Sequence, residues 1–191
     1  MQLQQIFYLH SCAKTSAYWL KDTHVAGGIT SMVRMLSTAA QFVTVENDSI
    51  LPNPEQPEHP HIKWLMQSAW NYQWGLSYWD SLCELGEDIF KFKHNVYKVR
   101  THLYKHIRSF PLEEFCPPPC LFDIAYLQKT TEESYRNFYR QVEAKPSTYN
   151  KMVAPFWVRT SQRVVLHRLP EKRKAYDLEA DPLADLKDDA E

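Results

Sequence analysis

Asp22 and His24 lie two residues apart at the expected start of a helix, and their side chains are of types that transfer protons. A histidine titrates near neutral pH, and a neighbouring carboxylate can orient its ring. A helix N-terminus also attracts anions, through its free N–H groups and its dipole. The structural alternative is that Asp22 only caps the helix and that His24 packs or faces solvent.

The helix that carries this pair is predicted from the spacing of its apolar residues. Steps of three and four separate Val25, Ile29, Met32, Val33, Leu36 and Ala40, which is typical of an amphipathic helix over about 22–41. Gly27 and Gly28 fall inside this pattern. Glycine in a helix interior costs about 0.5–1 kcal/mol relative to alanine, so we expect a close backbone approach there.

His102 and His106 are four residues apart, so on a helix they share a face and have the spacing of a metal-binding pair. No glutamate follows His102, which excludes the zinc-protease pattern. Two ligands are too few for a metal site, and we predict none. The structural alternative places one histidine in the core and the other at its rim.

The segment from residue 90 to 110 is basic and aromatic, with no acid between Asp88 and Glu113. Its cations can attract phosphates and its aromatic rings can stack on bases, so the segment can be a nucleic-acid interface. The alternative is a solvated helix whose aromatic rings pack in the core. The candidate nucleic-acid-binding residues are Lys91, Lys93, Lys98, Arg100 and Lys105.

Composition limits the class of protein. The chain has four cysteines and no recognisable secretory signal, so we expect reduced thiols and a cytoplasmic location. Cys116 and Cys120 flank three prolines that must be extended, and we interpret them as structural thiols. No apolar run is long enough to span a membrane.

The expected architecture is all-α: a helical, bundle-like single domain over residues 1–170, with a short N-terminal segment at 5–9 that is either an isolated strand or an extended lead-in. Only 4 glycines in 191 residues, long periodic stretches and recognisable caps favour helices over sheets. His59 is a possible cap before Pro60, and Thr130-Thr131-Glu132-Glu133 is a capping box whose helix would place Tyr135, Phe138, Tyr139 and Val142 inward. The expected long helices span about 22–41, 61–84, 87–108 and 131–143. Residues 171–191 are expected to form a flexible tail, basic and then acidic, that offers a surface to a protein partner. With seven acids and one lysine, residues 177–191 carry −6, which leaves about +5 on the rest of the chain.

Several motifs, in this order and spacing, resemble a family of small, functionally uncharacterised proteins that is widespread in tailed-phage genomes. The resemblance covers roughly residues 5–158. The matching pieces are Ile6-Phe7-Tyr8-Leu9, Asp22-Thr23-His24-Val25, Ser37-Thr38-Ala39, His59-Pro60 with Trp64, Ser68 with Asn71-Tyr72 and Trp74, Lys93-His94, and Tyr135-Arg136-Asn137-Phe138-Tyr139. The chain departs from the family pattern at His10, Gly27, Ser31 and Arg34, where the family has Asp, Lys, an acid and Gln. If those positions line an active site, this chain has an altered or lost activity.

The resemblance implies a phage-encoded protein of nucleotide or nucleic-acid metabolism, in the cytoplasm of the host. As an enzyme on a nucleotide or a nucleic-acid base, it would use Asp22, His24, His59 and His94 for acid–base chemistry. Asn71, Tyr72, Trp74 and Arg136 would then bind the substrate by hydrogen bonds and stacking. The alternative is a non-catalytic phage factor that binds DNA or a protein in assembly or host interaction. No cofactor is indicated by the sequence.

Overall fold

The computed structural model describes residues 5–45, 48–91 and 95–159. This part of the chain contains seven α-helices, several 3₁₀ turns, one π turn and no strand, which confirms the all-α prediction. Of the two alternatives for 5–9, the strand is wrong: the segment has no regular secondary structure and joins no sheet, so it is a lead-in to the first helix. It is buried instead, and its backbone is held by side chains, with Ile6 N donating to His61 Nδ1 at 3.1 Å and Leu9 N donating to Ser16 Oγ at 2.9 Å.

Helices α1 (Ala13–Tyr18) and α2 (Asp22–Thr44) follow this segment. The predicted periodicity of α2 is confirmed, because Val25, Ile29 and Leu36 are buried. The predicted cap is wrong. Lys21 is the N-cap residue of α2, and Asp22 is its first helical residue.

The predicted helix at 61–84 is two helices, α3 (Pro60–Gln67) and α4 (Ala69–Phe90). The break is at Ser68, whose backbone is extended and whose hydroxyl accepts from Trp70 N at 3.1 Å. A serine cap satisfies one of the free N–H groups of a new helix, so it allows a sharp change of direction. His59 caps α3 as predicted, and Pro60 occupies its first turn.

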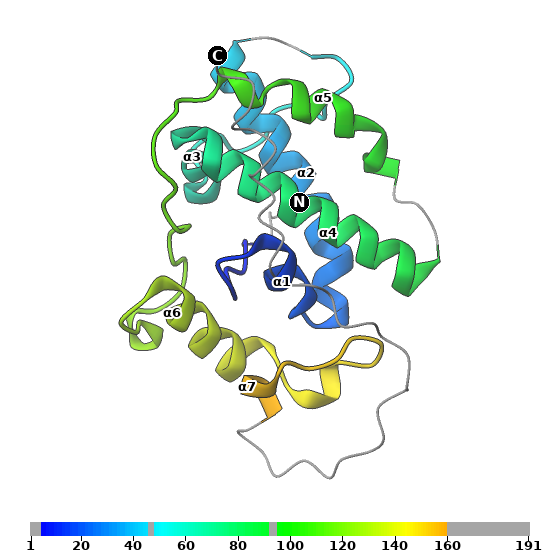
Figure 1. Ribbon diagram of the computed structural model, residues 1–191, viewed down its shortest axis with the longest axis vertical. Coiled ribbons are helices and arrows are strands. Elements are labelled where there is room, and N and C mark those ends of the chain that lie inside the picture. Colours follow the sequence, from blue (N-terminus) through cyan, green and yellow to red (C-terminus); the bar gives the residue numbers. More distant parts are fainter. Residues whose placement is uncertain (1–4, 46–47, 92–94, 160–191) are drawn as a thin grey trace, which may run out of the picture.

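Helices α2 and α4 form the centre of the molecule (Figure 1). A Cβ atom on Gly86 would lie 2.8 Å from Ile29 Cδ1, and one on Gly28 would lie 3.1 Å from Leu82 Cδ1. The expected close approach at Gly28 is therefore confirmed, and α4 has a matching glycine. Trp79 Nε1 donates across the same interface to Ile29 O at 3.2 Å. The largest fully buried side chains include Trp79, Tyr72, Tyr135 and Tyr139.

The predicted helix at 87–108 is also interrupted. Helix α4 ends at Phe90, where Lys91 adopts a left-handed conformation with φ of 59°. After residues 92–94, which lie outside the described part, the chain continues as a 3₁₀ turn (Asn95–Val99), α5 (Arg100–Lys105) and a second 3₁₀ turn (Ile107–Ser109). A left-handed C-cap is usually glycine, so the lysine gave no signal of the break.

The chain then runs in extended form along one side of the molecule to a second group of helices (Figure 1). A 3₁₀ turn (Ile124–Tyr126) precedes α6 (Thr131–Phe138), which begins with the predicted capping box of Thr130 and Glu133. A π turn (Tyr139–Glu143) continues α6, with Ala144 N donating to Tyr139 O at 2.7 Å. The extra residue of a π turn rotates the side chains that follow. Val142, predicted to face inward, is accordingly 49% exposed.

A 3₁₀ turn (Pro146–Thr148) and the short α7 (Phe156–Arg159) end the described chain beside α6. The predicted tail at 171–191 lies outside the described residues. Among the helices of the described part, none has the length and apolar composition that a membrane crossing requires.

Candidate functional site

His24 lies in the first turn of α2, where its ring contacts the π turn. Its Nδ1 is 3.1 Å from the Tyr139 hydroxyl, and its Nε2 is 3.3 Å from Glu143 Oε2. The ring is stacked on Phe7, with centroids 4.7 Å apart and planes 5° from parallel. Lys21 Nζ donates to Glu143 Oε2 at 3.0 Å. We call Lys21, His24, Tyr139 and Glu143 the His24 cluster.

The partners of His24 decide where its proton resides. A carboxylate only accepts hydrogen bonds, so Nε2 carries the hydrogen toward Glu143 and Nδ1 is left as an acceptor for the Tyr139 hydroxyl. That hydroxyl already accepts from Lys21 N at 2.8 Å. Burial, followed by the nearby charge of Lys21, lowers the pKa of His24 to about 4 against the opposing effect of Glu143. His24 is therefore a neutral imidazole at pH 7, and its tautomer is set by its neighbours.

The π turn brings Tyr139 and Glu143 to the same histidine. A π turn is uncommon and is frequently found at functional sites. The charged side chains of Lys21 and Glu143 are only 14% and 26% exposed. Removing such a pair from water costs desolvation free energy that apolar packing would not. A perturbed histidine within such a group is a candidate for function.

Asp22, the expected partner of His24, has another role. Its Oδ2 accepts from Asn150 N at 3.2 Å and from Lys151 N at 2.8 Å, and its Oδ1 accepts from Met152 N at 3.1 Å. Three backbone N–H groups thus satisfy one carboxylate. Asp22 anchors the segment before α7 to the start of α2.

Of the two other predicted catalytic histidines, the structure describes only His59, and His59 does not join the His24 cluster. His59 caps α3, accepting from His61 N at 3.3 Å. His94 lies outside the described residues. His61, a residue that the sequence did not mark as a candidate, is fully buried. Desolvation by burial lowers the pKa of its ring to about 3. His61 Nδ1 accepts from Ile6 N, so Nε2 carries the proton and lies 3.1 Å from Pro119 O. No spacing in the sequence marked it.

The residues predicted to bind a base are engaged inside the protein. Asn71 Nδ2 donates to Trp64 O at 3.0 Å, and Asn71 Oδ1 accepts from Cys116 N at 3.1 Å. Tyr72 is buried, and its hydroxyl lies 3.3 Å from Leu103 O. Trp74 Nε1 donates to Ser11 O at 2.7 Å. These groups tie α4 to the N-terminal and proline-rich segments.

Arg136, the fourth predicted substrate-binding residue, lies in the wall of a surface hollow of about 230 Å³. We call it the α6 hollow; it is lined by Gln128, Glu133, Arg136, Asn137, Arg140 and Trp157. Arg136 is held in place: its Nε donates to Leu9 O at 2.7 Å, its Nη2 pairs with Glu132, and its guanidinium lies 4.8 Å from the ring centroid of Trp19.

Trp157 contributes an unusual group to the same hollow. The residue is 8% exposed, and its indole Nε1 has no hydrogen-bond partner among the described residues. Indole nitrogen is a donor only. Leaving a buried donor unsatisfied costs about 1–3 kcal/mol, so native proteins rarely do so without a reason.

A second cavity, of about 10 Å³, adjoins His24. It is lined by Gln5, Phe7, His24, Gly28, Ser31, Met32, Met35 and Tyr78. This volume is about that of one water position. Ser31, one of the departures from the family pattern, therefore lies beside the candidate histidine. Arg34, another departure, pairs with Glu55 at 3.2 Å.

The basic segment is partly neutralised by carboxylates. Arg100 forms a two-point ion pair with Asp80, at 2.8 and 2.7 Å. Lys105 Nζ lies 2.9 Å from Asp48 Oδ2. Lys91 and Lys98 are exposed, and Lys93 lies outside the described residues.

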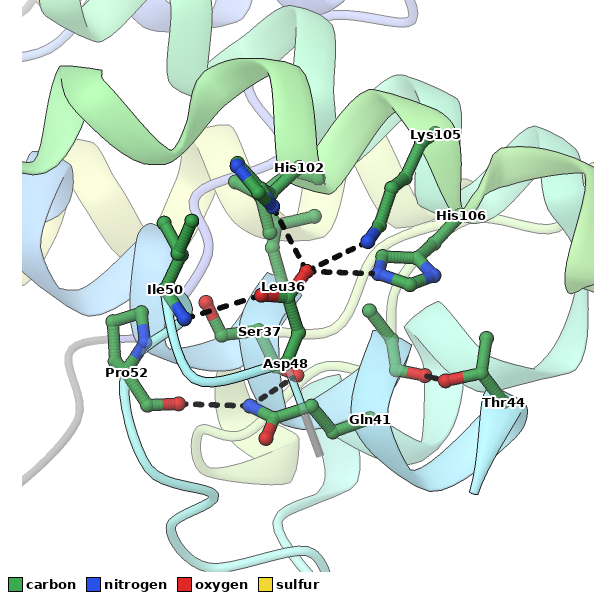
Figure 2. Close-up of polar contacts among 12 residues, drawn as sticks. Leu36, Ser37, Gln41, Thr44, Asp48, Ile50, Pro52, His102, Lys105 and His106 are labelled. Atoms are coloured by element: carbon green, nitrogen blue, oxygen red, sulfur yellow. Dashed lines mark hydrogen bonds and ion pairs between the residues drawn. The ribbon is translucent and has the colours of Figure 1, made fainter. Parts of the chain in front are cut away.

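Asp48 lies at the centre of a second polar group, which we call the Asp48 cluster (Figure 2). Its Oδ2 is 2.9 Å from His102 Nδ1, 2.9 Å from Lys105 Nζ and 3.7 Å from His106 Nε2, and its Oδ1 accepts from Ile50 N at 3.1 Å. Hydrogen bonds from Lys105 and then His102 hold the pKa of Asp48 well below its usual range. The prediction of one histidine in the core and one at its rim is confirmed, since His106 is 3% exposed and His102 is half-buried.

Neither cluster is built to hold a metal. Across residues 5–45, 48–91 and 95–159, no group of three or more His, Cys, Asp or Glu side chains is arranged to bind an ion. All four cysteines are free thiols. Compared with known proteins, the chain matches no family model, no curated protein and no solved structure.

Proposed function

We propose that this chain is a phage-encoded, helical protein of nucleotide or nucleic-acid metabolism that performs acid–base chemistry on a nucleotide or a nucleic-acid base. The ligand class comes from the family resemblance. The reacting groups come from the His24 cluster, and the observation that carries the proposal is the position of the His24 ring between the Tyr139 hydroxyl and the Glu143 carboxylate.

In this proposal, His24 is the general base and Glu143 orients it. A hydrogen bond to a carboxylate stabilises the imidazolium that forms when the ring accepts a proton, as in other nucleophile–base–orienter arrangements. Lys21 forms an ion pair with Glu143 at 3.0 Å. The lone pair of the neutral ring is at Nδ1 and faces the Tyr139 hydroxyl at 3.1 Å, so the proton that His24 accepts comes from this hydroxyl, which in turn takes one from the substrate. The cavity of about 10 Å³ beside the ring has room for one water.

The test is a turnover screen of the purified protein on mononucleotides and short oligonucleotides. His24→Gln and Glu143→Gln each keep a polar side chain but remove the titratable ring or the negative charge. We expect each to reduce turnover at least ~100-fold. His59→Gln is the matched control, because His59 lies outside the cluster. Variants with wild-type turnover would refute the assignment of the base.

The alternative is a non-catalytic factor that binds DNA or a protein. The exposed Lys91 and Lys98 favour a phosphate-binding surface on this side of the molecule. Lys98→Ala would then weaken DNA binding equally for all sequences and reduce the salt-dependence slope by about one. Arg100→Ala would have a smaller effect, because Arg100 is bound by Asp80. A protein partner at the tail would be lost on truncation after residue 170.

A further inference from the structure

We propose that the α6 hollow binds the phosphate group of a phosphate ester. The phosphate ester would be the substrate of the proposed function, and only this identification rests on that function. The hollow itself is independent of the His24 cluster: its lining side chains come from Gln128, from Trp157 and from the outer face of α6 and the π turn, whereas Tyr139 and Glu143 contact His24.

Two guanidinium groups face one carboxylate in the lining of the hollow. Guanidinium offers planar pairs of N–H donors that match phosphate oxygens, so arginine is favoured wherever phosphate is bound at two points. Arg136 is already fixed by Leu9 O, Glu132 and the Trp19 ring. Two of its five N–H donors are engaged in these contacts, which leaves others for a ligand.

Arg140 is the more available cation. It is exposed, and its contact with Asn137 Oδ1 is long, at 3.5 Å. Within the described chain it forms no ion pair with a carboxylate. The lone carboxylate of the lining, Glu133, is occupied by the capping box, where its Oε2 accepts from Thr130 N and Thr130 Oγ1. An incoming anion therefore meets an unneutralised guanidinium.

The Trp157 indole supplies the third observation. Trp157 lines the hollow, and its buried N–H finds no acceptor in the described structure. A phosphate or sugar oxygen bound beside it would provide that acceptor. The amide of Asn137 does not compete, because its Nδ2 donates to Tyr126 O at 3.1 Å and its Oδ1 accepts from Gln141 at 2.6 Å.

The volume limits how much of a ligand the hollow encloses. Sites that bury a whole drug-sized molecule have about 300–1,000 Å³, and this one has about 230 Å³. It suits a phosphate with its sugar, while the rest of the ligand extends outward. Arg140 stands in the π turn between Tyr139 and Glu143, so a ligand held here adjoins the element that carries the candidate catalytic groups.

Calorimetric titration of the full chain tests this inference. The ligands are inorganic phosphate, ribose 5-phosphate, a nucleoside, its 5′-monophosphate and a short single-stranded oligonucleotide. We expect the monophosphate to bind at least ~10-fold more tightly than the nucleoside. Preference among phosphate, sugar phosphate, nucleotide and oligonucleotide identifies the source of the phosphate.

Three variants and a control locate the site. Arg140→Gln should weaken binding of the monophosphate at least ~10-fold, and Arg140→Lys should restore part of it, since the charge returns without the two-point geometry. Trp157→Phe keeps an aromatic ring and removes only the N–H, and it should weaken binding several-fold. Arg108→Gln, an exposed change in a different element, should bind like the wild type.

The outcomes separate this inference from the acid–base proposal. Equal binding of nucleoside and monophosphate, or wild-type binding by both Arg140→Gln and Trp157→Phe with unchanged melting temperatures, overturns the α6 hollow as a phosphate site. Absence of binding by every phosphate compound also overturns it. Tight, Arg140-dependent binding together with wild-type turnover in His24→Gln supports the hollow and refutes the proposed base.

Discussion

The His24 cluster and the Asp48 cluster lie at the two ends of α2, and each combines a carboxylate, a lysine and histidine, yet they are organised in opposite ways. At the N-terminal end, a histidine is the central group, and it is stacked on Phe7 and bonded to Tyr139 and Glu143. Past the C-terminal end, a carboxylate is central, and three cationic or titratable side chains from one segment surround it (Figure 2).

The difference shows that the position of each group in the cluster, and not the composition, decides which group is charged. Burial disfavours the charged form of His24 more than Glu143 favours it, so the pKa of the ring falls. Asp48 accepts hydrogen bonds from Lys105 and His102, which stabilise its charged form, so the pKa of its carboxyl falls as well. One cluster therefore holds a neutral base and the other a fixed anion.

The largest expected effect is the pH dependence of stability at the His24 cluster. The folded-state pKa of His24, about 4, is below the usual 6.5. The neutral His24 ring makes its full contribution to the free energy of unfolding above pH 6.5. This contribution is lost as pH falls toward 4, because the histidine then binds a proton in the unfolded chain but not in the folded one. The loss reaches about 3 kcal/mol at pH 4. Urea denaturation at pH 7 and pH 4 measures it.

His61 titrates in the same range, because its pKa is also lowered, to about 3. His24→Gln should therefore remove only part of the pH dependence, and His59→Gln, a change at a less buried ring, should remove less. An unchanged dependence in His24→Gln would show that the ring is not desolvated as the structure places it.

Asp48→Asn should have the next largest effect. It removes the charge that Lys105 and His102 contact, and we expect a loss of about 1–2 kcal/mol in the free energy of unfolding at pH 7. Since the pKa of Asp48 is lowered on folding, this contribution is present above about pH 4 and is lost as pH falls below that value. Urea denaturation at pH 7 and pH 3 should show a difference that shrinks with acid. Asp88→Asn, at an exposed position of α4, is the control; an equal effect there would contradict the central role of Asp48.

Asp22→Asn distinguishes the anchor beside the His24 cluster from an acid–base partner. An amide oxygen cannot replace a carboxylate that accepts from three backbone N–H groups, and we expect a loss of about 1 kcal/mol in stability. Turnover per folded molecule should not change. Urea denaturation and turnover kinetics on the same sample measure the two effects. A large fall in turnover with wild-type stability would show that Asp22 is a catalytic residue.

Lys105→Gln should have the smallest effect. Lys105 is 51% exposed, and exposed ion pairs contribute about 0.2–1 kcal/mol. The loss should be at most about 0.5 kcal/mol and should vanish in high salt, because salt screens surface charges. Thermal unfolding in low and high salt measures it. A loss as large as that of Asp48→Asn would contradict the expectation that solvent screens the ion pair between Lys105 and Asp48.

The sequence by itself determined the elements whose signals are local. The periodicity of α2, the His59-Pro60 start of α3 and the Thr130–Glu133 capping box are each encoded within a few residues of the helix that they begin or fill. The breaks at Ser68 and Lys91 escaped the sequence analysis because the apolar spacing continues across them and neither has a glycine or proline.

Only the tertiary structure decided what the polar residues contact. His24 was recognisable as a candidate, but Tyr139 lies 115 residues away in sequence, and Glu143 reaches the ring through a π turn that no pattern predicted. His102 and His106 had the spacing of a pair, but their shared partner Asp48 is 54 residues away from His102. Side-chain chemistry and helical spacing are local properties, whereas burial and hydrogen-bond partners depend on which distant segments pack together, and these set the charge of each group.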